Sequence, residues 1–251
     1  MLQKEFFLSH DGLRIHAKLT KPEGDSLPLL VLIHGITGHM EEDHILGLAN
    51  AVALDGIATL RLEMYGHGKS DGDFSEHTIG KWVHQVCAGI DYAASLPWVS
   101  RLYLAGHSQG GLTVLLAGAL KQHKLSALLL LSPAINIWDG AGKGDFLGRP
   151  FDPANPPAIL PMSEDHFVRE TYLDVARFLP VEESIAAFQK RVLILHGDAD
   201  ESVPVKWATW AKERYHDALV KIIPGAKHCY DGLLEEMFKE VRGFLRECEE
   251  A

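Results

Sequence analysis

Short apolar runs alternate with longer amphipathic stretches along most of the chain. The first two runs alternate apolar with polar residues, which predicts an antiparallel hairpin at the edge of a sheet. The runs from Leu29 onward are mostly continuous, so both faces of those strands are expected to be buried, as in a parallel sheet covered by helices. The predicted strands are Glu5–Leu8, Arg14–Lys18, Leu29–Gly35, Ala58–Met64, Arg101–His107, Ala127–Pro133, Arg191–Gly197 and Val220–Gly225.

Segments of helical length lie between these strands. In the last of them, apolar residues recur near helical spacing from Leu233 to Phe244. Repeated strand–helix–strand order predicts an α/β fold with a doubly wound, mostly parallel, eight-stranded sheet. In such sheets, function gathers at the loops that leave the carboxyl ends of the strands. The predicted helices are Glu41–Asp55, Thr78–Ser95, Gln109–Gln122, Pro204–Tyr215 and Tyr230–Glu247.

One long segment interrupts this alternation after the sixth strand. Residues 134–188 begin with a stretch rich in Gly and Pro and contain two helix-like pieces, near Glu164–Phe178 and Pro180–Phe188. A loop this long within a compact domain is usually functional. Its aromatic and apolar content favours a packed cap over a disordered excursion. The sequence therefore predicts a core of residues 1–133 and 189–251 with an inserted cap, or lid, of residues 134–188.

Composition narrows the class of protein and its partners. Hydrophobic residues make up 47% of the 251 residues and charged residues 23%, which is ordinary for a globular chain. No apolar run reaches the roughly 18 residues of a membrane-spanning helix, so no membrane partner is expected. The net charge of −10, without a Lys/Arg cluster, argues against a nucleic-acid partner, because neutralising phosphates needs concentrated positive charge.

The cysteines and the N-terminal segment bear on the compartment. There are three cysteines and no C-x-x-C motif, which argues against a disulfide framework and against a thiolate zinc site. The segment MLQKEFFLSHDG has no charged region followed by an apolar one, so it does not resemble a signal peptide. A cytoplasmic protein is the expectation.

The strongest chemical signal is the segment GHSQGG, residues 106–111, between a predicted strand and a predicted helix. It contains the G-x-S-x-G nucleophile elbow, with Ser108 as the nucleophile. A sharp strand-to-helix turn strains the backbone at Ser108 and leaves no room for side chains at Gly106 and Gly110. The turn also directs a helix N-terminus at the reaction centre, where its partial positive charge favours an oxyanion. A junction without chemistry is the alternative, and two signals downstream argue against it.

Those two signals are loops that follow the last two predicted strands. HGDADESVP, residues 196–204, offers Asp198 and Asp200 as acids that could orient a histidine, and an Asx turn or helix cap would account for one of them. GAKHCY, residues 225–230, places His228 over the sheet edge. The chain order Ser, Asp, His distinguishes one serine-hydrolase topology from the others, and it favours His228 over the other histidines.

A fourth segment, IHGITG at residues 33–38, leaves the third predicted strand. A glycine turn at this point can present backbone N–H groups to the reaction centre, and acyl transfer needs two such donors near the developing oxyanion. The expected donors are the N–H of Ile36 and the N–H of Gln109, the residue after the nucleophile. His34 is expected to be a structural hydrogen-bonding residue.

Taken together, these segments resemble the α/β-hydrolase superfamily over nearly the whole chain. Within it, the sequence resembles the bacterial cinnamoyl/feruloyl esterase group of small serine esterases. The superfamily pattern D-x-x-V-P maps the acid onto Asp200 rather than Asp198. The group often has an aromatic residue in place of Ile36 and Asp in place of Glu63. The matching segments are HGITGH (34–39), RLEMYGHGKSDG (61–72), AGHSQGG (105–111), HGDADESVP (196–204) and GAKHCY (225–230).

The resemblance implies a serine carboxylic ester hydrolase that acts on small-molecule hydroxycinnamate esters. His228 would take the proton of Ser108, Asp200 would hold His228, and an acyl-enzyme would form and be hydrolysed by water. This chemistry requires neither a metal nor an organic cofactor. Five cap residues are candidates for lining the acyl pocket, with Asp139 as the partner of a phenolic hydroxyl; a small core of the cap itself is the alternative for the aromatic ones. They are Trp138, Asp139, Phe146, Phe151 and Tyr172.

Other functions share this fold. A broad short-chain carboxylesterase or a monoacylglycerol lipase would show most of the same motifs. An aminopeptidase-type hydrolase would need acidic residues for a substrate ammonium, which Glu164 and Asp165 could supply. A binding module would usually lack one of the three catalytic residues. A homodimer is suggested by the resemblance alone.

Overall fold

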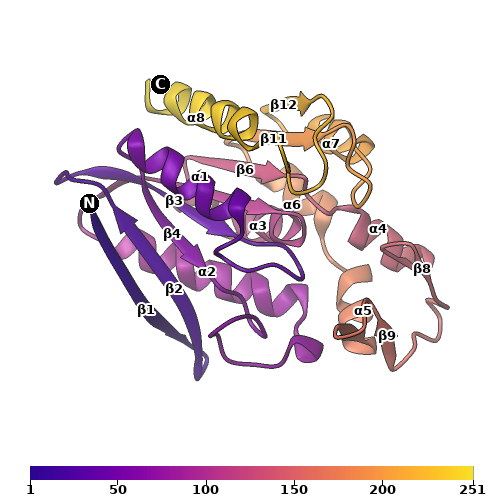
Figure 1. Cartoon of the computed structure of the whole chain (residues 1–251). Coiled ribbons are helices and arrows are strands. Elements are labelled where there is room, and N and C mark those ends of the chain that lie inside the picture. The colour runs from indigo at the N-terminus through magenta and orange to yellow at the C-terminus, as the bar shows by residue number, and fades with distance from the viewer. Residues whose placement is uncertain (251) are drawn as a thin grey trace.

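A single twisted sheet forms the centre of the protein. The structure is a computed structural model that describes residues 1–250. The strands of the sheet are β1 (Leu2–His10), β2 (Leu13–Lys21), β3 (Leu27–Ile33), β4 (Ala58–Leu62), β5 (Val99–His107), β6 (Ala127–Leu131), β11 (Arg191–Gly197) and β12 (Ala218–Ile223). They lie in the order β1-β2-β4-β3-β5-β6-β11-β12 (Figure 1). β2 pairs antiparallel with β1 and β4, and every other pair is parallel, which confirms the predicted doubly wound sheet.

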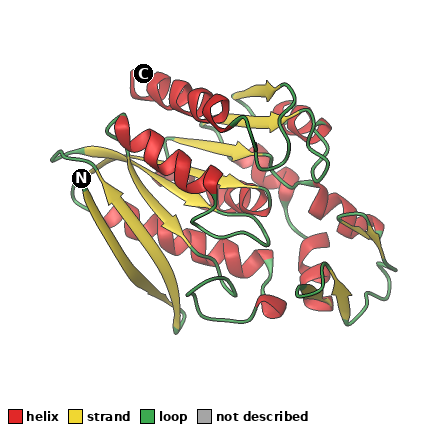
Figure 2. Cartoon of the chain, viewed as in Figure 1, coloured by secondary structure: helices red, strands yellow, loops and turns green. Residues whose placement is uncertain are grey.

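Helices cover both faces of this sheet (Figure 2). On one face lie α1 (Asp43–Leu54) and α8 (Leu234–Glu250). On the other lie α2 (Ile79–Ser95), α3 (Gln109–Lys121), α6 (Val181–Ala187) and α7 (Lys206–Lys212). Successive residues of β3 enter the two cores in turn, Val31 on the α2 side and Leu32 on the α1 side. Burial of both faces explains why the central strands are continuously apolar in the sequence.

The segment between β6 and β11 is built of short elements. It contains α4 (Asn136–Lys143), β7 (Asp145–Phe146), β8 (Arg149–Pro150), β9 (Ile159–Pro161), β10 (Phe167–Arg169), α5 (Glu170–Arg177) and α6, with β7–β8 and β9–β10 as two small antiparallel pairs. It lies beside the ends toward which β6 and β11 point (Figure 1). Because α6 packs on α3, part of the segment shares the core of the sheet. The division at residues 134 and 188 stays a prediction.

Two details of this segment differ from the prediction. The helix expected near Glu164–Phe178 begins only at Glu170, because residues 167–169 form β10 instead. α4 was not predicted at all. Its sequence, NIWDGAGK, contains two glycines, which weaken a helical pattern, and a third follows directly as its C-cap in the left-handed conformation.

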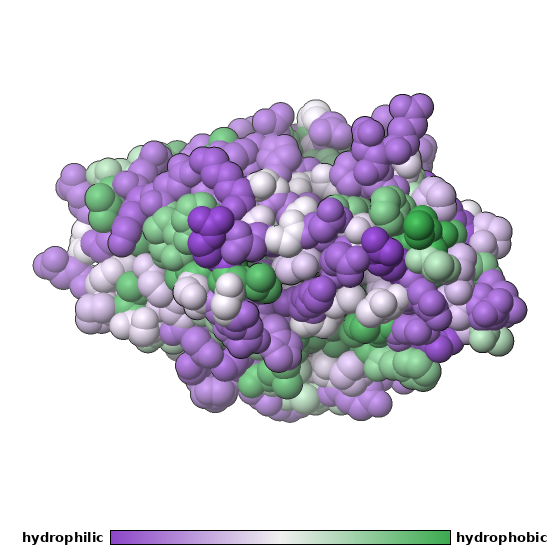
Figure 3. Space-filling model, turned by 90° about the horizontal axis from the view of Figure 1, so that it is seen from below, coloured by the Kyte–Doolittle hydropathy of each residue, from purple (hydrophilic) through white to green (hydrophobic). Residues whose placement is uncertain are grey.

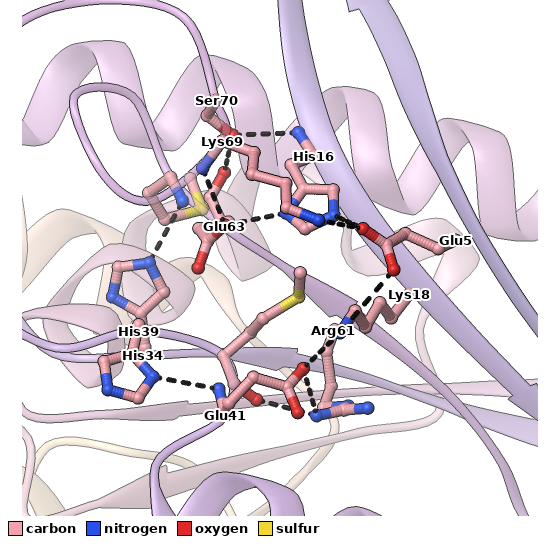
Figure 4. A network of polar contacts seen from close by, with 12 residues as sticks. Glu5, His16, Lys18, His34, His39, Glu41, Arg61, Glu63, Lys69 and Ser70 are labelled. Atoms are coloured by element: carbon pink, nitrogen blue, oxygen red, sulfur yellow. Dashed lines mark hydrogen bonds and ion pairs between the residues drawn. The ribbon is translucent and has the colours of Figure 1, made fainter.

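A polar network ties the edge hairpin to the loop after β4 (Figure 4). The buried ring of His16 contacts Glu63 Oε2 through Nδ1, at 2.7 Å, and Glu5 Oε1 through Nε2, at 2.8 Å. Glu63 Oε2 also accepts the backbone N–H of Lys69 at 3.0 Å. The hydrogen bond from Lys69 Nζ, followed by that from His16, lowers the pKa of Glu5 to about 2. The network thereby holds the loop of residues 63–70 against the sheet edge.

The outer surface is mixed in character. On the face shown in Figure 3, apolar residues form small patches separated by hydrophilic ones. Large exposed apolar side chains come from separate elements, such as Leu54 of α1, Leu120 of α3 and Phe178 after α5. Among residues 1–250, no helix has the length and apolar character needed to cross a bilayer. These separate patches identify no interface, so a homodimer stays a prediction.

Candidate active site

Ser108 stands at a sharp turn between β5 and α3. Its backbone has φ 56° and ψ −122°, and its N–H donates to the carbonyl of Leu131 at the end of β6, at 2.9 Å. A Cβ atom added at Gly106 would lie 2.3 Å from the carbonyl oxygen of Gly110, and one added at Gly110 would lie 2.4 Å from that of His34. The turn therefore requires glycine on both sides of the serine, for the steric reason expected from the sequence.

This crowding makes a stability prediction. We expect Gly110→Ala to lower the free energy of unfolding by about 3 kcal/mol, because the new methyl group meets backbone rather than a flexible side chain. Gly243→Ala in α8 is the matched control, since nothing lies within 4 Å of its added Cβ. That variant should be more stable by about 0.5–1 kcal/mol, from helix propensity. Urea unfolding of both variants is the measurement, and similar effects at the two sites would contradict the steric argument.

The structure brings the side chains of Ser108, His228 and Asp200 into one hydrogen-bonded chain. His228 Nε2 lies 2.9 Å from Ser108 Oγ, and His228 Nδ1 lies 2.8 Å from Asp200 Oδ2. A carboxylate only accepts hydrogen bonds, so Nδ1 carries the ring proton of a neutral His228. Nε2 is then the acceptor for the hydroxyl of Ser108. This is the tautomer that a general base for Ser108 needs.

Asp200 is buried and oriented by several donors. Its Oδ1 accepts the backbone N–H groups of Ser202, at 2.9 Å, and Val203, at 2.8 Å, while His196 Nε2 lies 3.3 Å from its Oδ2. Burial by itself would raise the pKa of Asp200. The contact with His196, the hydrogen bond from His228 and the backbone N–H of Val203 together outweigh burial and hold that pKa far below its usual range. Asp200 is therefore an ionised acceptor at neutral pH.

The neighbouring Asp198 has a different contact. Its Oδ1 accepts the backbone N–H of Gly225 at 2.6 Å, so it joins the loop after β11 to the loop after β12. Of the two aspartates that the sequence offered, Asp200 contacts His228 and Asp198 supports a turn.

The loop that carries His228 is anchored on both sides of the ring. The hydroxyl of Tyr230 donates to the carbonyl of Leu195 at 3.0 Å and accepts from Ser132 Oγ at 2.9 Å. On the other side, His107 Nε2 donates to the carbonyl of His228 at 2.8 Å. The backbone around His228 is thus fixed by contacts to β5, β6 and β11.

His107 is itself supported by a histidine that the sequence did not single out. His44 Nε2 donates to His107 Nδ1 at 3.1 Å. Burial lowers the pKa of His44 to about 4 and that of His107 well below its usual value, so both rings are neutral near pH 7. No local motif predicts this pair, because His44 lies on α1 and His107 is the last residue of β5, far away in the sequence.

The two expected oxyanion donors flank the serine. Among the described residues, neither the N–H of Ile36 nor that of Gln109 donates to another protein group, so both remain available. His34 holds the strand end beside them. Its Nε2 accepts the N–H of Met64 at 3.0 Å and its Nδ1 donates to the carbonyl of Gly35 at 2.7 Å. Burial lowers the pKa of His34 to about 3, which suits the structural part expected for it.

A cavity of about 320 Å³ opens above the serine. The part of its lining that comes from the core includes Ser108, His228, Cys229 and the loop of residues 35–38. Burial, followed by the carboxylate of Glu42, raises the pKa of the Cys229 thiol to about 11, so the thiol is protonated near pH 7. The wall from the inserted segment consists of Ile137, Leu147, Met162 and Ser163.

None of the five cap residues expected at the acyl pocket lines this cavity, which corrects that expectation; Asp139 lines an adjoining cavity that shares Leu147 and Ser202 with it. Phe146 and Tyr172 are fully buried and pack edge to face, and the Tyr172 hydroxyl donates to Gln109 Oε1. Trp138 packs against Trp210.

The remaining two also point elsewhere. Asp139 pairs with Lys143 at 2.7 Å, and Phe151 packs, half-buried, against the main core. The physical reason for the error is the phase of α4. Ile137 and Ala141 form its buried face, one turn apart, and Ile137 lines the cavity while Trp138, one position further on, packs against Trp210.

The comparisons with known proteins agree with this geometry. A model of the family described as "Serine aminopeptidase, S33" matches residues 24–151, just over half of the chain. The chain belongs to this family of α/β-hydrolases. The structure of Est1E from Butyrivibrio proteoclasticus with ferulic acid bound matches with a TM-score of 0.96 and 41% identity, over 98% of this chain and 100% of that one.

Two further comparisons give more distant similarities. The monoacylglycerol lipase of Mycolicibacterium smegmatis is 27% identical over 88% of each chain. Mouse α/β hydrolase domain-containing protein 10 shares the fold, with a TM-score of 0.80 at 19% identity over 97% of this chain. The predicted resemblance to the superfamily and to its small bacterial esterases is confirmed. The protein is a carboxylic ester hydrolase.

Proposed function

We propose that this esterase cleaves hydroxycinnamate esters through a covalent acyl-enzyme formed on Ser108. The observation that carries the proposal is the chain of hydrogen bonds from Ser108 through His228 to Asp200, which opens into a cavity with an apolar wall. The three residues come from loops after β5, β12 and β11, all at the carboxyl ends of parallel strands. That is where ligands bind in folds of this kind.

In the proposed reaction, His228 Nε2 takes the proton of Ser108 as Oγ attacks the ester carbonyl. Asp200 stabilises the imidazolium that forms and keeps the ring oriented. The N–H groups of Ile36 and Gln109 hold the negative oxygen of the tetrahedral intermediate, which contributes about 3 kcal/mol for each donor. His228 then gives its proton to the departing alcohol. A water molecule, deprotonated by the same nitrogen, attacks the acyl-enzyme and releases the acid.

The acyl group is inferred from similarity and from the wall of the cavity. Est1E, at 41% identity, is seen with ferulic acid bound. In this chain Ile137, Leu147 and Met162 give the cavity an apolar side, which would contact a planar aromatic acyl group. Ser202 adds a hydroxyl group to the same lining, and this group could bond to a phenolic substituent.

Monoacylglycerol hydrolysis is the second candidate, because the relative from Mycolicibacterium smegmatis is matched over 88% of both chains. An aminopeptidase activity has less support, despite the description of the family. Glu164 and Asp165, the two cap acids expected to hold a substrate ammonium, are exposed and do not line the cavity of Ser108; its one acidic lining residue is Glu42, from the core.

The substrate test is a comparison of kcat/KM for methyl ferulate, p-nitrophenyl butyrate and a monoacylglycerol. We expect methyl ferulate to be preferred by about 10-fold or more, since filling an apolar cavity with a matching group contributes about 1–3 kcal/mol. An aminoacyl arylamide, assayed alongside, should give no turnover. Equal or lower kcat/KM for methyl ferulate would contradict the hydroxycinnamate assignment while leaving the esterase mechanism intact.

A further inference from the structure

A second cluster of reactive side chains lies beside the catalytic residues and has no chemical step in the proposed mechanism. It consists of His44, His107 and Cys229. Their donor atoms, two imidazole nitrogens and one sulfur, all lie within 4.8 Å of one another. His44 Nε2 and His107 Nδ1 are 3.1 Å apart, and Glu42 Oε2 lies 3.9 Å from His44 Nε2.

The three residues are held by different parts of the fold. His44 belongs to α1, His107 ends β5, and Cys229 lies in the loop after β12. The two histidines are each only 3% exposed, while Cys229 is half-buried and lines the same cavity as Ser108. An ion would reach the cluster from this cavity, whose lining also includes Glu42 and His107.

The absence of a C-x-x-C motif argued against a thiolate zinc site, but this cluster draws its side chains from three separate parts of the fold. We propose that it binds one Zn²⁺ ion, and that occupation of the site inhibits the esterase. Two imidazoles and a thiolate are ligands that Zn²⁺ prefers. Glu42 lies outside this group of three and would supply the fourth ligand by turning its carboxylate, now 3.9 Å from His44 Nε2, toward the ion. In a tetrahedral site two ligand nitrogens lie about 3.3 Å apart, which is close to the separation found here. On binding, the thiol of Cys229 releases its proton to solvent. The proton on His44 Nε2 moves to Nδ1, which frees Nε2 to coordinate.

The inhibitory part rests on the proposed function of Ser108 and His228. His228 is connected to the cluster in two ways: His107 Nε2 donates to its carbonyl at 2.8 Å, and Cys229 is the next residue in the chain. The donor atoms of the three residues are now up to 4.8 Å apart, and coordination of a single ion draws them closer together. This moves the loop and with it the imidazole that now lies 2.9 Å from Ser108 Oγ. A displacement of about 1 Å at a reacting group costs about 100-fold in rate.

Metal binding is measured first and separately from catalysis. Zn²⁺ is titrated calorimetrically into the wild-type chain and into Ser108→Ala, and Co²⁺ is used as a spectroscopic substitute. We expect one ion per chain in both proteins, with a thiolate-to-cobalt charge-transfer band in the near ultraviolet. Cys229→Ser should lose the band, and it and His44→Gln should each weaken Zn²⁺ binding by about 10-fold or more. Having two variants keeps the test valid if one of them folds poorly.

Two controls separate this site from others on the chain. Cys87→Ser removes another half-buried cysteine, and His84→Gln disrupts the more exposed group of His10, Asp11 and His84. Neither should change the band. Retention of the band in Cys229→Ser, or its loss in Cys87→Ser, would overturn the site.

Inhibition is then measured on the wild type. One equivalent of Zn²⁺ should lower kcat on a p-nitrophenyl ester by about 100-fold, and EDTA should restore it. Full turnover with the site occupied would overturn the inhibitory part. A protein that binds the ion normally but shows no metal-free esterase activity would instead count against the proposed function, so the two failures are distinguishable.

Discussion

Replacing Ser108 with alanine is expected to lower kcat for ester hydrolysis by about 10⁶-fold, because removal of the nucleophile of the proposed triad leaves only binding and oxyanion stabilisation. The hydroxyl removed is the one 2.9 Å from His228 Nε2, and no covalent acyl-enzyme can form without it. The fold should be unaffected, since the turn is held by the backbone of residue 108 and by its glycine neighbours. Steady-state hydrolysis of methyl ferulate and circular dichroism are the two measurements.

Ser163→Ala is the matched control. It removes a hydroxyl from the lining of the same cavity, where the side chain contacts only His166, and it should change kcat by no more than about 3-fold. A fluorophosphonate probe should label the wild type and Ser163→Ala but not Ser108→Ala. Labelling that persists in Ser108→Ala, or the absence of labelling in a folded wild type, would contradict the proposed mechanism.

Asp200→Asn is expected to lower kcat by about 10⁴-fold with little change in fold. The backbone N–H groups of Ser202 and Val203 both point at Oδ1, so the amide oxygen of the new side chain takes that position. Its NH₂ group then faces His228 Nδ1 and makes that nitrogen an acceptor. The ring proton moves to Nε2, and the imidazole can no longer take the proton of Ser108.

Asp198→Asn tests the same chemical change two residues away. Asp198 accepts only the N–H of Gly225, and the amide oxygen of asparagine can do the same. We expect kcat to stay within about 3-fold of the wild type. Comparable losses in the two variants, measured with methyl ferulate, would show that Asp200 has no special part in catalysis.

Strands and helices of the core were predictable because their signals are local. β11 was predicted at both of its bounds, and most other core elements to within about two or three residues. α8 is the exception, since it begins at Leu234 rather than near Tyr230. Tyr230 has a positive φ of 61° and sends its hydroxyl to Leu195, which keeps the backbone there out of a helix. That contact joins residues 35 positions apart, and no local pattern contains it.

For the cap, the sequence predicted a packed insertion but not which of its side chains face the cavity above Ser108. Trp138 was a plausible pocket residue by type, yet Ile137 is the neighbour that lines the cavity. The difference is a rotation of about 100° around a helix, and the packing of α4 on α5 selects it.

The sequence by itself determined the parallel sheet, the place of the proposed nucleophile and the order in which this serine, the aspartate and the histidine occur, because hydrophobic periodicity and the glycine-flanked turn act over a few residues. Tertiary structure decided which side chains meet. The contact of Asp200 with His228, the apolar wall supplied by Ile137, and the approach of His44, His107 and Cys229 all depend on how α1, the sheet and the late loops pack together. Distances between residues so far apart along the chain are set by that packing, and no run of neighbouring residues encodes them.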